Sequence, residues 1–376
     1  MKNNIIVLII LVISACSSIP KIEKTESLDT LIQKPQFNYK IRSLPQTIRV
    51  YFNGQDSEFN LPLEAQGFIA NSYFYNSKIS YKPKISFSNL GALDCSNPLI
   101  QEDLIVIFNL RDKSQNLEKQ NCFKVMPKSK TFYVSNQEDN YGFSNTFLIS
   151  RDDEKKQLIN ELDKYSERII LIDSNKTLDK ENIKNSLQEL NKEVVELETY
   201  GNNLSSQDMF AKLLMVDRSK ERKRKLSRRI SESISGDSRT REDIDTFFLS
   251  VDLKEARNLK PALDYISEKD FDVYILNSWS TKNTYYKDDR DLSGSIHADF
   301  PIMMPIEIPE FIRDENRSRE FALGYDLFEI ILMKYGDVNY RNYIYKGLSG
   351  KIVLEDKKVK RIPYLFKITD TGLEIL

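Results

Sequence analysis

Histidine and cysteine, two side chains that often carry catalysis, are scarce in this sequence. Its 376 residues include one histidine, His297, and three cysteines. A Ser/His/Asp or Cys/His site would have to be built around that single imidazole, and a zinc site would need carboxylates for most of its ligands. We interpret His297 as a hydrogen-bonded structural residue near a point where the chain passes between two lobes.

Two pairs of adjacent carboxylates, Asp152 with Asp153 and Asp288 with Asp289, are the other groups that could do acid–base chemistry. Adjacent acids in loops are mostly solvated, and neither pair comes with a glycine-rich phosphate loop or metal-ligand spacing. We therefore predict that the protein is not an enzyme and that it carries no cofactor and no metal.

The N-terminus, MKNNIIVLIILVISACSS, has a charged start, an apolar run from Ile5 to Ile13 and small residues before Cys16. The run is shorter than the roughly 20 residues of a membrane-spanning helix. This pattern is typical of a secretory signal, and VISAC resembles the bacterial lipobox. We predict a lipoprotein signal peptide in residues 1–15, lipidation of Cys16 and, because Ser17 and Ser18 follow, sorting to the periplasmic side of the outer membrane. The alternative is an ordinary signal peptide with a chance cysteine. Residues 16–44 show no periodicity and are predicted to be a flexible tether.

A basic stretch, LLMVDRSKERKRKLSRRI, interrupts a chain with 55 basic and 56 acidic residues. Export and the balanced charge argue against nucleic-acid binding. Leu226, Ile230 and Ile234 share one face of a predicted helix, and Asp217 is predicted to cap its start. The helix is either docked on the protein through Leu226 and Ile230 with a solvated cationic face, or an anchor for an acidic patch on a partner. The candidate partner-binding residues are Arg218, Arg222, Arg224 and Arg228.

Cys95 and Cys122 remain after the predicted lipidation site. In an oxidising periplasm an isolated pair usually forms a disulfide, and we predict one here.

Short strands rich in Val, Ile, Leu and Phe alternate with amphipathic helical patterns along the chain. LIVIFNL, RIILIDS and DVYILNS are examples of the strands, and DDEKKQLINELDKYS and KENIKNSLQELNKE of the helices. Such alternation predicts an α/β fold with parallel sheets flanked by helices. More than 300 residues follow the tether, which is too many for one core, so two lobes are expected.

Several motifs, in order, resemble the C-terminal domain of the LpoA/YraM family, the outer-membrane lipoprotein activators of penicillin-binding proteins. The basic stretch resembles the family's VDRS..RKR.L run. The segment REDIDTFFLSVDLKEARNLKPALDYISEKDFDVYILNSWS resembles DIDF.FL...P.EAR.IKP.L.F....DLPVYATS. Later segments, RDLSGSIHADFPIMM, FALGYDLFEI and GLSGKIVLEDKKVKRIPYLFKITDTGLEIL, resemble the family's RDLDG..F.DMPW, ALG.DAY.L and GLTG.L.LD..GRI.R.LPWA.F..G.

This resemblance implies a two-lobed type I periplasmic-binding-protein-like fold. We expect lobe 1 to hold residues 45–152 and 297–346, and lobe 2 to hold residues 153–296 and 347–376. It also implies a non-catalytic regulator that binds a bifunctional class A penicillin-binding protein and activates peptidoglycan synthesis, mainly transpeptidation. Larger family members place a helical domain between the lipid and this fold, where this sequence has the predicted tether.

The runner-up function is a lipid-anchored periplasmic solute-binding receptor. Strand ends at Ser135, Asn136, Ser278 and Trp279 are the candidate cleft residues. The sole tryptophan, Trp279, fits either lobe packing or a ligand platform. The family's WG after a lobe-two strand is replaced here by SNKTLDKEN, and the loss of that glycine makes a small-molecule ligand unexpected.

Overall fold

A computed structural model describes the folded part of the chain. The described residues are 45–376 apart from 53–60, 77–82, 95, 97–102, 111–119, 136–140, 176–179, 202–203, 235–238, 278–289, 305–311, 313–316, 336–343 and 355–357. The predicted signal peptide, residues 1–15, and tether, residues 16–44, lie outside the described residues. In the described part of the chain, no helix combines the length and apolar character needed to cross a membrane.

The first sheet has eight strands in the order β11-β12-β13-β5-β4-β3-β1-β2. Neighbours among β1 to β5 run parallel, β13 runs parallel to β5, and β11, β12 and β13 form an antiparallel meander. All six residues of β3 are buried, as expected for a central parallel strand covered on both faces. The strands are β1 (Thr47–Phe52), β2 (Lys84–Asn89), β3 (Leu104–Asn109), β4 (Thr131–Ser135), β5 (Asn145–Leu148), β11 (Ile344–Lys346), β12 (Lys351–Leu354) and β13 (Lys358–Ile362).

The second sheet has seven strands in the order β15-β14-β10-β9-β8-β6-β7. Strands β6 to β10 run parallel, whereas β14 runs antiparallel to β10, and β15 antiparallel to β14. The strands are β6 (Arg168–Ser174), β7 (Glu193–Tyr200), β8 (Thr246–Val251), β9 (Asp272–Asn277), β10 (Ser295–Asp299), β14 (Tyr364–Thr369) and β15 (Gly372–Ile375).

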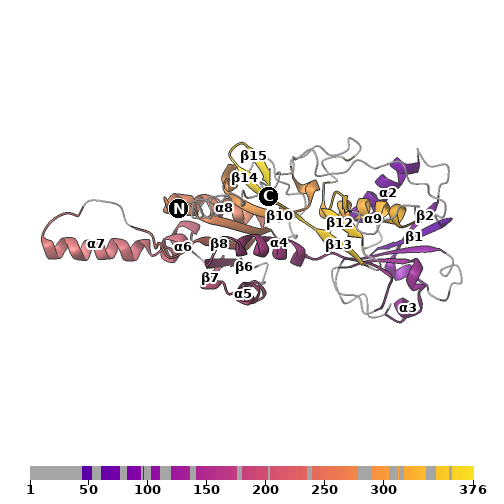
Figure 1. Ribbon diagram of the computed structural model, residues 1–376, viewed down its shortest axis with the longest axis horizontal. Coiled ribbons are helices and arrows are strands. Elements are labelled where there is room, and N and C mark those ends of the chain that lie inside the picture. The colour runs from indigo at the N-terminus through magenta and orange to yellow at the C-terminus, as the bar shows by residue number, and fades with distance from the viewer. Residues whose placement is uncertain are drawn as a thin grey trace, which may run out of the picture.

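Helices cover both faces of each sheet, and the two units lie side by side along the longest axis of the molecule (Figure 1). In the first unit, α2 and α9 cover one face and α3 the other. In the second, α4 and α5 cover one face, and α6 and α8 the other. The helices are α2 (Leu63–Asn76), α3 (Gln120–Val125), α4 (Arg151–Asp163), α5 (Lys180–Glu189), α6 (Ser206–Leu213), α7 (Val216–Ile230), α8 (Leu253–Ile266) and α9 (Arg319–Tyr335). The predicted two-lobed, mainly parallel α/β fold is confirmed.

Helices α2 and α9 touch backbone to backbone. A Cβ added to Gly324 would lie 1.8 Å from the Glu64 carbonyl oxygen, and one added to Gly67 would lie 2.0 Å from the Phe321 carbonyl oxygen. Only glycine allows this approach. Fourteen of the seventeen residues of α9 are buried.

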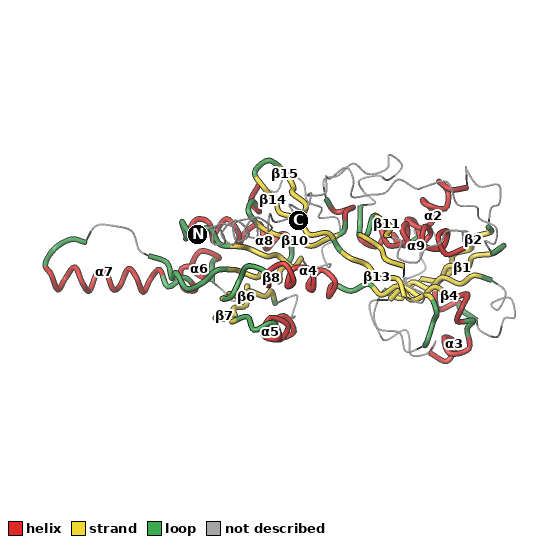
Figure 2. The backbone as a smooth tube through the Cα atoms, viewed as in Figure 1, coloured by secondary structure: helices red, strands yellow, loops and turns green. Residues whose placement is uncertain are grey.

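The chain crosses between the sheets three times among the described elements, from β5 to β6, from β10 to β11 and from β13 to β14. The predicted division placed residues 297–346 in lobe 1 and residues 347–376 in lobe 2. Two of its boundaries were wrong, because β10 belongs to the second sheet, whereas β12 and β13 belong to the first. The chain therefore leaves the second sheet after β10, which ends at Asp299, and returns to it at β14, which begins at Tyr364. Figure 2 shows both strands in the second unit.

Candidate functional site at the junction of the two sheets

An arginine just after the first crossing contacts the ends of two strands of the second sheet. Ser150 caps α4, its hydroxyl accepting a hydrogen bond from the Asp152 amide, and Asp153 completes a capping box. Asp152 and Asp153, which open the predicted helix DDEKKQLINELDKYS, lie in the first turn of α4. Arg151, the first residue of α4, donates from Nε to the Asn277 carbonyl oxygen at 2.9 Å and from Nη2 to the Leu276 carbonyl oxygen at 2.8 Å.

Nη2 of Arg151 also lies 3.3 Å from the hydroxyl of Ser250. Its guanidinium therefore occupies the carboxyl ends of β8 and β9. In open α/β sheets this edge is where ligands usually bind.

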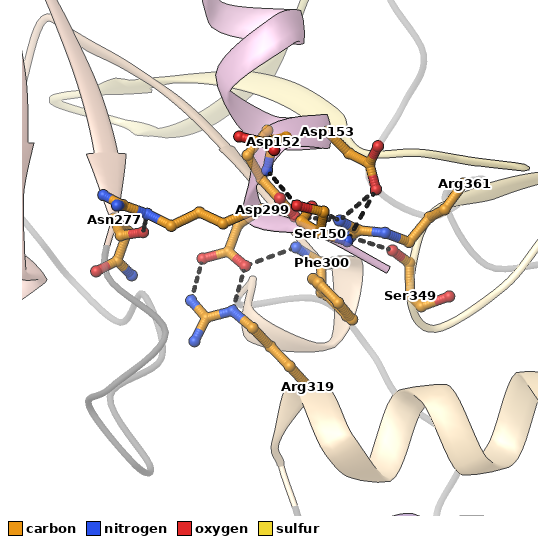
Figure 3. Close-up of polar contacts among 11 residues, drawn as sticks. Ser150, Asp152, Asp153, Asn277, Asp299, Phe300, Arg319, Ser349 and Arg361 are labelled. Atoms are coloured by element: carbon orange, nitrogen blue, oxygen red, sulfur yellow. Dashed lines mark hydrogen bonds and ion pairs between the residues drawn. The ribbon is translucent and has the colours of Figure 1, made fainter. Parts of the chain in front are cut away.

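A second arginine, Arg361, ties the third crossing to α4. Its side chain leaves β13, is fully buried, and lies 2.6 Å from Glu154 and 3.5 Å from Asp153 (Figure 3). It also donates to the carbonyl oxygen of Ser349 at 3.3 Å, and its guanidinium carbon stacks 4.2 Å from the ring centre of Phe300.

A third arginine, Arg319, joins the two units at the second crossing. It begins α9 of the first unit and forms a bidentate ion pair with Asp299 at the end of β10, at 2.8 and 2.5 Å (Figure 3). Both side chains are buried, and Asp299 also accepts a hydrogen bond from the Phe300 amide at 2.8 Å. Arg319 and Arg361 thus bind carboxylates of the second unit from elements of the first, whereas Arg151 holds the start of α4 to its own sheet. Arg151, Arg319 and Arg361 are called the junction arginines below.

Two carboxyl groups near the junction titrate far from their ordinary range. Burial raises the pKa of Glu154 to about 7 in spite of the opposing charge of Arg361. Burial likewise raises the pKa of Asp326 to about 7, although Asp326 accepts hydrogen bonds from the amides of Leu348 and Ser349 at 2.9 and 2.6 Å. Asp326 fills the space beside Gly347, where a Cβ would lie 2.4 Å from its carboxylate.

This arrangement is suited to structure rather than to turnover. Arg361 binds Asp153 and Glu154, Arg319 binds Asp299, and backbone amides bind Asp326, so each of these carboxyl groups has a structural partner. In the described ranges, no three His, Cys, Asp or Glu side chains gather closely enough to hold a metal ion.

A family model for LppC, a putative lipoprotein family, matches residues 112–360. The match begins after β3, ends within β13 and makes up well over half of the chain. The chain belongs to the LppC family. A comparison with curated proteins finds no match.

Solved structures similar to this LppC-family protein include full-length LpoA from Haemophilus influenzae, with a TM-score of 0.57 at 14% identity over 90% of this chain. The alignment covers 60% of LpoA, so the chain spans less than two thirds of that protein. A putative branched-chain amino acid ABC transporter protein from Rhodospirillum rubrum has a TM-score of 0.55 at 10% identity, over 89% of this chain and all of its own. At such low identities, these structural similarities show a shared fold alone.

The candidate cleft residues are only partly described in this LppC-family protein. Ser135 ends β4 and is buried, and its carbonyl oxygen accepts a hydrogen bond from the Ile149 amide at 2.8 Å. Asn136, Ser278 and Trp279 lie outside the described residues, so the cleft stays a prediction.

The cysteines and the histidine occupy structural settings where they are described. Cys122 is disulfide-bonded. Its predicted partner Cys95 lies outside the described residues, as does Cys16, so the pairing and the lipidation stay predictions. His297 is buried in β10, stacks on Phe366 with 5.4 Å between ring centres, and lies 2.7 Å from the Ser295 hydroxyl through Nε2. Burial lowers the pKa of His297 to about 3, so its ring is neutral at pH 7.

The basic stretch forms α7, which projects from the far end of the second unit, away from the first (Figures 1 and 2). The alternative that docks this helix through Leu226 and Ile230 is wrong, because these side chains are 54% and 50% exposed. The helix begins at Val216, and Asp217 lies in its first turn rather than at the cap, which is Met215. The four candidate partner-binding residues, Arg218, Arg222, Arg224 and Arg228, are all exposed.

Reasoning from the sequence missed the junction arginines. The signal that could have found Arg151 is the run Ser150 to Asp153, in which a capping serine is followed three residues later by an acid. No comparable local signal marks Arg319 or Arg361, whose partners are 20 and 207 residues away.

Proposed function

We propose that this LppC-family protein is a non-catalytic, lipid-anchored regulator that binds a class A penicillin-binding protein and activates its peptidoglycan synthesis. LpoA from Haemophilus influenzae, whose full-length form shares this fold, is a regulator of PBP1A. The ordered sequence motifs and the LppC family match support the same role for this chain. Anchoring at the outer membrane through Cys16 is part of the proposal.

The observation that carries the non-catalytic, surface-acting role is the position of Arg151. Its guanidinium binds the carbonyl oxygens of Leu276 and Asn277 and contacts Ser250, at the edge where a solute-binding protein would hold its ligand. A small ligand there would have to displace a charged group from three partners. This arrangement favours regulation through surfaces over reception of a solute.

The decisive experiment reconstitutes the full-length lipidated protein in detergent micelles with the class A synthase of the same cell and lipid II. We expect binding and a rise in cross-linked muropeptides relative to the synthase alone. A synthase that neither binds the protein nor changes its cross-linking would refute the proposal.

A parallel titration with amino acids and other metabolites, followed by the fluorescence of the sole tryptophan, tests the receptor alternative. We expect no saturable change. A saturable response in the micromolar range would instead favour a solute receptor.

The anchor is tested separately by labelling cells with radioactive palmitate. We expect label in the wild-type protein and none in Cys16→Ser. Label-free wild-type protein would refute the lipid anchor without bearing on the synthase.

A further inference from the structure

Helix α7 carries a dense positive charge on a part of the molecule that little else covers. Eight of the residues from Arg218 to Arg229 are Lys or Arg, and the helix contains two acids, Asp217 and Glu221. Glu221 pairs with Lys225 at 2.7 Å, and Asp217 lies 3.8 Å from Lys220. Within the described residues, no acidic side chain from another element forms an ion pair with Arg222, and the same is true of Arg224 and Arg228.

The helix has weak support of its own. An isolated helix of this length is marginal in water, and its many like charges repel one another. Met215 and Ser231, which flank it, both have left-handed backbone, and no side chain caps its N-terminus. Such a helix would gain stability from an acidic partner that neutralises it.

A groove runs between the base of α7 and the end of α8. Its volume is about 1000 Å³. Apolar side chains line it from both sides, with Val216, Leu226 and Ile234 on the α7 side and Tyr265 and Ile266 on the α8 side. Tyr265 is 77% exposed and Leu226 54% exposed, so much of this apolar surface is open to solvent.

Cations stand along the α7 wall of the groove. Arg222 and Lys223 line it, whereas Arg218, Arg224 and Arg228 do not. With 3.6 residues per turn, Arg224 and Arg228 lie on the face of α7 opposite Leu226. The acids of the lining, Glu242 and Glu268, come from outside α7.

We propose that this groove binds an acidic, amphipathic segment of the partner synthase, with apolar side chains on Leu226 and Tyr265 and carboxylates against Arg222 and Lys223. The inference rests on the proposed function and adds the binding surface and the chemistry of the segment. Charge complementarity selects an acidic occupant, and concavity selects a protein segment, because a bilayer surface is too flat to enter a groove. Ile230 extends the apolar stripe beyond the groove on the same helical face.

The test uses full-length protein and compares two double charge reversals on the same helix. Arg222→Glu with Lys223→Glu changes the groove wall, and Arg224→Glu with Arg228→Glu makes the same change of charge on the opposite face. Binding to the class A synthase is measured by surface plasmon resonance in 150 mM salt. We expect the groove pair to weaken binding roughly tenfold or more, since carboxylates would then face carboxylates. The opposite pair should change it less than threefold, because salt screens charges beyond about 8 Å.

A second variant, Leu226→Gln with Ile230→Gln, tests the apolar stripe of α7, of which Leu226 lines the groove and Ile230 lies beyond it. Both side chains are about half exposed and glutamine is a good helix former, so folding should persist, which thermal unfolding checks. We expect roughly tenfold weaker binding, and in the wild type slower amide exchange of α7 when the synthase is bound.

The outcomes separate the two proposals. If the groove pair and the glutamine pair both bind the synthase as tightly as the wild type, the groove proposal is refuted and the proposed function stands. The same holds if only the opposite pair loses binding. Binding to vesicles of phosphatidylethanolamine and phosphatidylglycerol in a 3:1 ratio tests a membrane as the occupant. If the groove pair loses binding to the vesicles but still binds the synthase, the groove proposal is also refuted. Absence of any wild-type binding to the synthase would remove the proposed function itself.

Discussion

The ion pair between Arg319 and Asp299 should be a main stabiliser of the junction. Arg319→Met would leave the Asp299 carboxylate buried without its cation. The two side chains are 6% and 1% exposed and share two hydrogen bonds, and removing one partner of such a buried pair typically costs 3–5 kcal/mol. Because Asp299 keeps its hydrogen bond from the Phe300 amide, we expect the lower end, about 3 kcal/mol.

Urea unfolding followed by far-ultraviolet circular dichroism measures this loss as a shift of the midpoint. Asp299→Asn alone should also lower the free energy of unfolding, because it leaves Arg319 charged and buried without its carboxylate partner. The double variant, Asp299→Asn with Arg319→Met, should be less destabilised than the sum of the single variants by more than 1 kcal/mol, since it buries no unpaired charge.

The matched control is Lys225→Met, which breaks the exposed pair with Glu221 and should change stability by less than about 0.5 kcal/mol. An Arg319→Met variant within 1 kcal/mol of the wild type, or strictly additive single variants, would show that this pair does not hold the junction.

Three further changes test other parts of the structure. Gly324→Ala should lower the free energy of unfolding by about 3 kcal/mol or more, because its methyl group would meet the Glu64 carbonyl oxygen at 1.8 Å, and urea unfolding at neutral pH measures the loss. Asp326 has a raised folded pKa of about 7 against an ordinary value of 3.8, so its favourable contribution is complete below pH 3.8 and is lost as the pH rises through 7. Between pH 4 and pH 8, the free energy of unfolding of Asp326→Asn should therefore rise relative to that of the wild type by on the order of 4 kcal/mol. A difference in unfolding free energy that does not vary with pH would contradict the raised pKa. If Cys95 is the partner of Cys122, Cys122→Ser should lower the free energy of unfolding by up to about 3.6 kcal/mol under oxidising conditions. The double variant, Cys95→Ser with Cys122→Ser, should then be no less stable than either single variant.

The general fold could be predicted from the sequence because its signals are local. The run LIVIFN is apolar at five of six positions, as a strand covered on both faces requires, and it forms β3 in the interior of the first sheet, between β4 and β1. The periodic helices α4 and α5 follow in the same way from their apolar spacing. The boundaries between the lobes could not be predicted, because neither strand pattern nor length says which of two sheets a strand joins. β13 enters the first sheet by pairing with β5, whose residues lie more than 200 positions earlier.

The candidate site was less predictable, because its contacts are distant in sequence. Arg361 reads as one more charge in a basic strand, KVKRI, and only the folded chain brings it to Glu154. Helix α7 was predicted as a helix, with two alternatives for its exposed faces, and the alternative of docking within the chain through Leu226 and Ile230 was wrong. An amphipathic pattern shows that a helix has an apolar face and says nothing of which molecule covers that face.

The junction and α7 are consistent with one mode of action. A receptor that closes on a solute needs a hinge that changes cheaply between two states, and the solute can shift that equilibrium only by its difference in affinity for them. Here buried ion pairs with Arg319 and Arg361 hold two of the crossings, and breaking one would cost several kcal/mol. In the proposed mode of action, energy from a partner bound at α7 is not consumed in closing the lobes. Two units joined by buried ion pairs, with a projecting cationic helix, suit the proposed presentation of a surface to another protein, and the comparison of the two faces of α7 tests that proposal.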